Sequence, residues 1–402
     1  MARTHRIPGP LRCLIAGGGV AALEVTIALR DLAPDLVDVE LLAPEHEFWY
    51  RPLAVAEPFG LARVVRFELA ELAGSVNATF SLGALVSVDT DTRVATTSHG
   101  QEIEYDVLVL ACGARPVPAL EGALTFRGPA DSDAFRRLLA DVRDGAVESI
   151  AFVLPSTVEW GLPLYELALL TATYLERQGI RSVDLTLVTH EPEPLALFGG
   201  ESSEAVGKLL AAKGIGLETG VHVESFSEGV LTTVPGDGIR ADRAVALPRL
   251  VGPAIAGLPS DREGFVPTDE LGRVTGVEGV YAAGDATTFP VKQGGIATQQ
   301  ADAVAESIAA EAGAPVEPRP FRPVLHGLLL TGGQTAYLRS ELGGGRGESA
   351  TVSGDALWWP PAKIVGRYLA PFLAGRGEID LNPPPATGNV PVEVDLTSLV
   401  TH

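Results

Sequence analysis

The residues with the clearest chemistry are glycines that follow a short, largely apolar run near the N-terminus. After residues 11–16, Gly17, Gly19 and Ala22 stand at the spacing Gly-x-Gly-x-x-Ala, and a helical apolar pattern then begins. In a strand–turn–helix unit the first glycine permits a tight turn, and the second lets the backbone approach a pyrophosphate. The small third residue packs helix against strand, and the helix N-terminus offers N–H groups and a positive dipole. The segment therefore predicts a dinucleotide phosphate site.

A ribose-binding acid is expected about 20 residues further on, at the end of the second strand. We predict that strand over 37–42, and Ala43 stands where the acid would be. Glu45 is the nearest acid and is taken as the substitute ribose ligand. The phosphate assignment does not depend on it.

Two later segments indicate which dinucleotide is bound. Ala111-Cys112-Gly113 follows a predicted buried strand over 105–110, and Gly284-Asp285 follows another over 279–283. An aspartate at a strand end can accept a hydrogen bond from a sugar or ribityl hydroxyl. A helix to about residue 310 comes next, and its N-terminus offers N–H groups and a dipole to the flavin N1/C2=O edge. The three motifs in this order favour FAD.

With these motifs, residues 11–315 resemble the two-dinucleotide-domain flavoproteins of the pyridine nucleotide–disulfide oxidoreductase superfamily. The resemblance implies an α/β fold with two Rossmann-like dinucleotide-binding domains of three-layer ββα architecture, plus a small C-terminal domain. It also implies the domain boundaries. The FAD-binding domain would comprise residues 1–116 and 246–315, the inserted NAD(P)-binding-like domain residues 117–245, and the C-terminal domain residues 316–402.

The resemblance also implies a set of FAD contacts. The first glycine motif would hold the pyrophosphate, Asp285 the ribityl chain, and Ile296 and Ala297 the pyrimidine end of the flavin ring. The backbone of Val86 matches a position that brackets adenine. The full implied set is Gly17, Gly19, Ala21, Ala22, Glu45, Pro52, Val86, Ala111, Cys112, Gly113, Gly284, Asp285, Ile296 and Ala297.

Within the superfamily, the chain is similar to the sulfide:quinone oxidoreductase and flavocytochrome c sulfide dehydrogenase branch. The similarity lies in the proline-rich turn 155–166, and in residues 48–52, which also resemble type II NADH dehydrogenases. The turn lacks the second Gly-x-Gly-x-x-Gly, which disfavours NAD(P)H there. Glu191, after the next strand, could still meet a ribose hydroxyl or simply occupy a turn.

Sulfide oxidation in that branch uses two cysteines beside the flavin. Trp160 stands at the first of these positions, and the only cysteines, Cys13 and Cys112, precede the second. The resemblance therefore implies a relative without a thiolate relay. We expect Cys13 and Cys112 to be small buried hydrophobic residues.

Three side chains are candidates for catalysis, each with a plainer alternative. Lys292, one of four lysines, would favour an anionic reduced flavin or anchor an acidic acceptor, or else be a solvated loop residue. Trp160 would form a wall over the flavin ring or belong to the core. Glu166 would carry a proton or simply lie near a helix start.

The C-terminal part carries an apolar stripe within 356–374, at helical spacing. Such a helix would pack on the flavin domains or lie in a membrane interface and admit a quinone. The glycine-rich run 342–347 is expected to be a loop, with a lid as one role. No run of 18 apolar residues predicts a transmembrane segment. The formal charge of −21 and pI near 4.7 argue against nucleic acid as a partner.

These observations favour an FAD-dependent oxidoreductase that passes electrons through a non-covalent flavin between an unidentified small-molecule donor and an acceptor such as a quinone. An NAD(P)H-dependent flavoprotein reductase and a catalytically silent FAD-binding protein are the alternatives. No signal-type apolar region is found near the N-terminus, so we expect a cytoplasmic protein. Peripheral contact with the inner face of the membrane and a homodimer both stay open.

Overall fold

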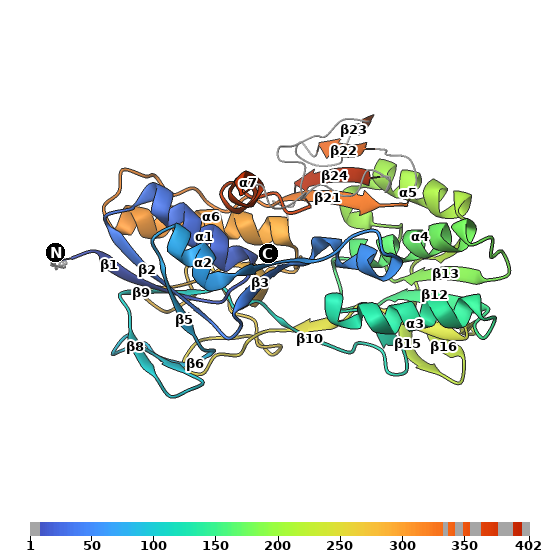
Figure 1. The fold of residues 1–402 in the computed structure, drawn as a ribbon, viewed down its shortest axis with the longest axis horizontal. Helices are drawn as coiled ribbons and strands as arrows, with labels where there is room; N and C mark the ends of the chain where they lie inside the picture. Colours follow the sequence, from blue (N-terminus) through green and yellow to red (C-terminus); the bar gives the residue numbers. More distant parts are fainter. Residues whose placement is uncertain (1–8, 333–336, 342–348, 354–362, 377–388, 396–402) are drawn as a thin grey trace.

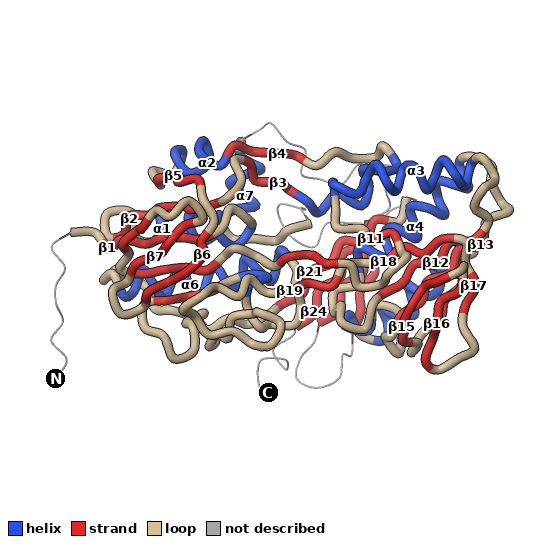
Figure 2. Tube along the Cα trace, turned by 90° about the horizontal axis from the view of Figure 1, so that it is seen from below, coloured by secondary structure: helices blue, strands red, loops and turns tan. Residues whose placement is uncertain are grey.

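The computed structural model describes residues 9–332, 337–341, 349–353, 363–376 and 389–395. Two α/β bodies lie side by side along the long axis, and antiparallel strands β10 and β19 run between them (Figures 1 and 2). The bounds of the connecting strands are Arg115–Val117 and Arg249–Val251.

The first body is built on a parallel five-stranded sheet of order β20-β9-β1-β2-β5. One face is covered by α1 and α6, whose alanines let the two helices pack closely together, and the other by the antiparallel sheet β6-β7-β8. This is the predicted three-layer ββα arrangement. The bounds are β1 Leu11–Ala16, α1 Val20–Leu32, β2 Val37–Ala43, β5 Thr79–Leu82, β6 Leu85–Asp89, β7 Val94–Thr97, β8 Glu102–Glu104, β9 Val107–Leu110, β20 Val280–Ala282 and α6 Gly294–Glu311.

The second body repeats this plan with a parallel sheet of order β11-β18-β12-β13-β14. Helices α3, α4 and α5 belong to it, and the antiparallel sheet β15-β16-β17 packs on the opposite face through Leu231. The bounds are β11 Leu124–Thr125, α3 Ser132–Arg143, β12 Ser149–Leu154, α4 Leu162–Arg177, β13 Asp184–Thr189, α5 Gly200–Ala212, β14 Ile215–Glu218, β15 His222–Ser227, β16 Val230–Val234, β17 Ile239–Arg240 and β18 Arg243–Ala246.

Shorter elements connect the bodies and border the sheets. They are β3 Glu47–Tyr50, paired with β4 Val65–Glu68, then helix α2 Leu69–Ser75 and the 3-10 turns η1 Arg51–Phe59, η2 Pro129–Asp131, η3 Ala196–Phe198 and η4 Gly284–Ala286. Near the C-terminus β21 Val324–Leu330 pairs with β24 Asn389–Asp395, and β22 Tyr337–Glu341 pairs with β23 Ser349–Ser353.

The predicted helical stripe over 356–374 is helical only from Leu369, where α7 Leu369–Gly375 begins. Residues 363–368 are irregular, because their backbone makes hydrogen bonds with side chains of α1 and α6 instead of within a helix. Ile364 and Leu373 are buried in the same core cluster as α1, so this part of the stripe packs on the first body. Residues 356–362 and the predicted loop 342–347 lie outside the described residues.

Candidate functional site

A deep cavity of about 1760 Å³ opens where the carboxyl ends of β1, β2 and β9 meet the second body. Parallel sheets of this kind bind ligands at the carboxyl ends of their strands. The volume exceeds the roughly 300–1,000 Å³ of an ordinary ligand pocket. The cavity therefore has room for a long cofactor and a second molecule beside it.

The glycine turn between β1 and α1 forms one wall of this cavity. Gly17 has φ +135°, and a Cβ there would lie 2.1 Å from the carbonyl oxygen of Ala111 on the neighbouring strand end. A Cβ at Gly19, in contrast, would meet no atom within 4 Å. Gly17 is thus required by the protein backbone, and Gly19 leaves open the space that a pyrophosphate needs. Ala21 and Ala22 are buried in the first turn of α1 and pack against the sheet.

Gly284 and Asp285 lie opposite this turn in η4. Gly284 has φ +75°, and its Cβ would lie 3.1 Å from that of Ala21. Asp285 lines the cavity, and burial raises the pKa of its carboxyl, opposed by the charges of Lys292 and Arg51. In the part of the chain that the structure describes, no hydrogen bond reaches the Asp285 carboxylate, so it is free to accept one from a ligand hydroxyl.

Lys292 also lines the cavity, but it is not a solvated loop lysine. Its Nζ lies 3.9 Å from the centre of the Phe265 ring and donates a hydrogen bond to the carbonyl of Thr287. Burial lowers the pKa of Lys292 to about 8, against the charges of Asp285, Asp261 and Glu263. A partly desolvated cation therefore stands near Asp285.

The N-terminus of α6 differs in detail from the expected arrangement. The backbone N–H of Ile296 donates to the side chain of Gln293 at 2.9 Å, so it is not available to a ligand. Ile296 is buried away from the cavity, whereas Gly294 and Ala297 line it. The positive end of the helix still faces the cavity, through the residues on either side.

The remaining predicted cofactor residues fall into two groups. Glu45, Pro52, Ala111 and Gly113 line the cavity. The side chain of Val86 is 49% exposed, and the cavity wall at that point is formed by Ala84 and Leu85.

The expectation for the two cysteines holds for Cys13, which is buried in β1, but is wrong for Cys112. Cys112 follows β9 at its carboxyl end and is exposed in the floor of the cavity. It is surrounded by protein on its other sides, and this burial raises the pKa of its thiol to about 11.

The two bodies are joined at the cavity by a buried ion pair that the sequence did not predict. Lys363 Nζ lies 2.5 and 2.7 Å from the two carboxylate oxygens of Glu166 on α4, and 3.2 Å from the carbonyl oxygen of Pro52. The N–H of Leu330 donates to the same carboxylate at 2.8 Å. The signal that could have revealed Lys363 is a lone charge inside an apolar segment.

Burial acts on both members of this pair in opposite directions. It raises the pKa of Glu166 and lowers the pKa of Lys363, and each partner's charge opposes the shift. The two pKa values therefore approach one another. The cavity wall therefore holds a buried proton donor next to a carboxylate whose affinity for a proton is raised.

The apolar part of the cavity lies beside this pair. Trp160 lines it and packs against Phe198, with ring centres 5.7 Å apart. Trp160 is thus both a cavity wall and part of an aromatic cluster. The other apolar lining residues here include Val55, Phe126, Leu162 and Leu328.

The acid of the second body that could bind a ribose, Glu191, is hydrogen-bonded within the protein. Glu191 follows β13, where a dinucleotide fold places its ribose ligand, but only 8% of it is exposed. Its carboxylate accepts hydrogen bonds from the hydroxyls of Tyr165 at 2.7 Å and Thr189 at 2.9 Å. Glu191 is therefore an internal anchor of α4.

A family model described as pyridine nucleotide-disulphide oxidoreductase matches residues 11–305, nearly three quarters of the chain. The chain belongs to this family. It is a family of FAD-dependent oxidoreductases, so the predicted family, fold class and cofactor are confirmed. The geometry agrees, because the open space at Gly19 and the unpaired carboxylate of Asp285 suit a pyrophosphate and a ribityl hydroxyl.

Known members of the family differ in activity. The sulfide-quinone reductase of Aquifex aeolicus (strain VF5) is 26% identical over 264 residues, which are 62% of this chain and 61% of that protein. An NADH dehydrogenase-like protein of Mycobacterium tuberculosis (strain CDC 1551 / Oshkosh) is 30% identical over 291 residues, 68% of this chain and 72% of that one. The solved sulfide:quinone oxidoreductase of Aquifex aeolicus shares the fold, with a TM-score of 0.71, 23% identity, and coverage of 80% and 81% of the two chains.

Among the described residues of this family member, no helix combines the length and apolar character needed to cross a bilayer.

Proposed function

We propose that this family member passes electrons through a non-covalent FAD from an unidentified small-molecule donor to a quinone-class acceptor, without a cysteine relay. The Glu166–Lys363 pair carries the proposal, because it places a buried proton donor in the wall of the cofactor cavity, beside apolar lining residues. An apolar wall with one proton donor suits a flat, hydrophobic acceptor that gains protons as it gains electrons.

The reaction balances in electrons and protons. Reduction of a quinone to a quinol consumes two electrons and two protons, and bound FAD supplies two-electron transfer. Lys363 Nζ donates the first proton to a quinone oxygen. Glu166, with its raised pKa, then takes up a proton from solvent and passes it to the neutral amine. The second proton follows by the same route from solvent.

The absence of a cysteine relay is supported by the positions of the thiols. The sequence has two cysteines, and Cys13 is buried in the middle of the first sheet. Cys112 alone reaches the cavity, so no second thiol stands beside it to form a disulfide or pass on a persulfide.

The test is the reoxidation of anaerobically photoreduced, flavin-loaded protein by a soluble short-chain quinone, followed by flavin absorbance. We expect fast reoxidation of the wild type, and reoxidation slowed about 100-fold in Lys363→Met. Lys208→Met is the matched control, because Lys208 pairs with Glu204 on the exposed face of α5 and does not line the cavity. Equal rates in all three proteins would contradict the role of Lys363, and no reoxidation of the wild type would contradict a quinone acceptor.

A second candidate is an NADH-dependent reductase, favoured by the mycobacterial relative, which is named NADH dehydrogenase-like. The engaged carboxylate of Glu191 opposes it. Rapid anaerobic bleaching of the flavin by NADH would establish this candidate instead. A protein that holds FAD but that no donor reduces would be the silent binding protein. Cytoplasmic location, contact with the membrane surface and a homodimer stay predictions of the sequence.

A further inference from the structure

Residues 363–376 form a strap that runs from the cavity across the first body and ends in α7. At one end of the strap Lys363 contacts Glu166, and at the other α7 packs on α1 (Figure 1). The strap contributes the buried residues Ile364, Leu369 and Leu373 to the core cluster of the first body. Whatever holds the strap down therefore also positions Lys363.

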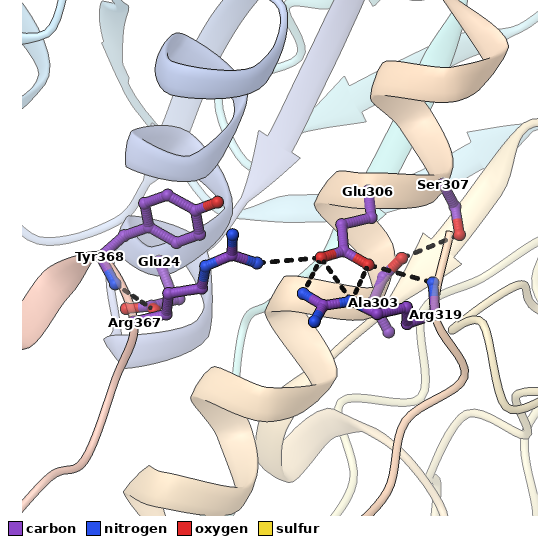
Figure 3. Close-up of polar contacts among 7 residues, drawn as sticks. All are labelled: Glu24, Ala303, Glu306, Ser307, Arg319, Arg367 and Tyr368. Carbon is purple, nitrogen blue, oxygen red and sulfur yellow. Dashed lines mark hydrogen bonds and ion pairs between the residues drawn. The ribbon is translucent and has the colours of Figure 1, made fainter. Parts of the chain in front are cut away.

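The strap is held mainly by Glu24, a carboxylate in α1 that has no exposed surface. It accepts hydrogen bonds from the backbone N–H groups of Tyr368 at 2.8 Å and Leu369 at 2.7 Å. The approach is close, since a Cβ on Gly366 would lie 2.9 Å from Glu24 Oε2. Thr298 of α6 adds a bond of 2.6 Å to the carbonyl oxygen of Val365. Figure 3 shows Glu24 beneath the strap backbone.

Asp302 approaches Glu24 from α6, so two carboxyl groups face each other in a mostly dry contact. Within the described residues, Oδ1 of Asp302 is buried and has no hydrogen-bond partner, and the Asp302 carboxyl group lies within interaction range of the Glu24 carboxylate. Burial and then the charge of Glu24 raise the pKa of Asp302 to about 8. Burial raises the pKa of Glu24 as well, but backbone N–H groups of the strap donate to its carboxylate and oppose that shift, so Glu24 is the member of the pair whose ionised form the strap favours.

Other charged groups around Asp302 also act on the pKa of its carboxyl group. Glu306 faces it from α6, Arg319 from the segment after α6, and Arg367 and Tyr368 from the strap. Both arginines are already paired with Glu306, Arg367 at 3.0 Å and Arg319 through its backbone N–H at 3.0 Å and its guanidinium (Figure 3). Glu306 offsets only one of these two positive charges, so the arginines oppose the raised pKa of Asp302, and burial together with the charge of Glu24 outweighs them.

We infer that Glu24 and Asp302 share one proton and form a pH-sensitive clasp that holds the strap, and with it Lys363, on the FAD-binding domain. With the proton present, the Asp302 hydroxyl donates to the Glu24 carboxylate, which in turn accepts the strap N–H groups. When the proton leaves to solvent, two carboxylates repel each other in a medium of low dielectric constant, and the strap separates from α1 and α6. Only one consequence rests on the proposed function: that release of the strap moves Lys363 away from its place as proton donor.

The sign of the pH dependence follows from linkage. The docked strap raises the pKa of Asp302 above that of a solvated carboxyl, so docking weakens as pH rises and levels off above about 8. Between about pH 7 and about pH 9, the ratio of open to docked strap should rise about tenfold. As the pH is lowered below about 7, the ratio of open to docked strap should continue to fall.

Trypsin can report this opening, because the bond after Arg367 lies within the strap. The rate of cleavage there, followed by intact mass, is divided by the rate after Arg181, an exposed loop residue of the second body. For the flavin-loaded wild type we expect the ratio to rise about tenfold from about pH 7 to about pH 9. A ratio that does not change with pH would overturn the inference.

Two variants separate the clasp from general loosening of the protein. Asp302→Asn keeps the shape of the side chain and cannot ionise, so its cleavage ratio should stay low and flat across this pH range. Glu24→Gln removes the charge that holds the strap, and its ratio should be high at both pH values. If Asp302→Asn shows the wild-type pH dependence, the clasp is wrong. Because the measurement involves no electron acceptor, it can fail or succeed independently of the quinone proposal.

Discussion

At the scale of single residues, the two glycines of the first motif have separable roles. Gly17 is required by the protein itself, because a Cβ would lie 2.1 Å from Ala111 O at φ +135°. We expect Gly17→Ala to lower the free energy of unfolding by more than about 3 kcal/mol. A Cβ at Gly19 would meet no protein atom within 4 Å, so we expect Gly19→Val to change the free energy of unfolding by less than about 0.5 kcal/mol while flavin retention falls at least about tenfold.

Denaturant unfolding and flavin absorbance after desalting measure the two effects separately. Gly74→Val in α2 is the control, because its Cβ also meets no atom and lies outside the cavity. A yellow Gly19→Val protein would show that the pyrophosphate does not pass over this turn.

At the scale of elements, the Glu166–Lys363 pair connects α4 of the second body with the strap. Breaking a buried pair leaves one charge without compensation, which costs about 3–5 kcal/mol. We expect Lys363→Met to be destabilised by this amount, and Glu166→Gln/Lys363→Met by clearly less, since no charge is left buried. The denaturant midpoints of the single and double variants measure the loss of stability in each. Additive losses would mean that the two side chains do not interact energetically.

At the scale of the whole molecule, the formal charge of −21 makes the folded state repel itself. Salt screens this repulsion, and the screening length is about 8 Å at about 0.15 M. We therefore expect the melting temperature of the flavin-loaded protein to rise when sodium chloride is added to a low-salt buffer. Scanning calorimetry measures it, with a neutral osmolyte as control for effects on hydration. A melting temperature that falls with salt would show that favourable ion pairs outweigh the net repulsion.

Much of the local architecture could be predicted from the sequence. The strand expected over 37–42 is β2 Val37–Ala43, and the helix expected to end near 310 is α6, which ends at Glu311. The glycine turn and the Gly-Asp motif lie where they were expected, in the cavity wall. Such motifs are predictable because backbone sterics and helix N-termini act within a few residues of the chain.

The tertiary structure decided the rest. Lys363 reaches Glu166 across 197 positions, and Glu24 binds the backbone at Leu369 across 345. Gln293 takes the N–H of Ile296, and the strap is irregular where its spacing predicted a helix. The sequence by itself determined the FAD-binding frame, because that frame is built from local turns and apolar periodicity. Only packing of the two bodies and the strap decides which buried charges meet, because burial and long-range proximity leave no periodic pattern in the chain.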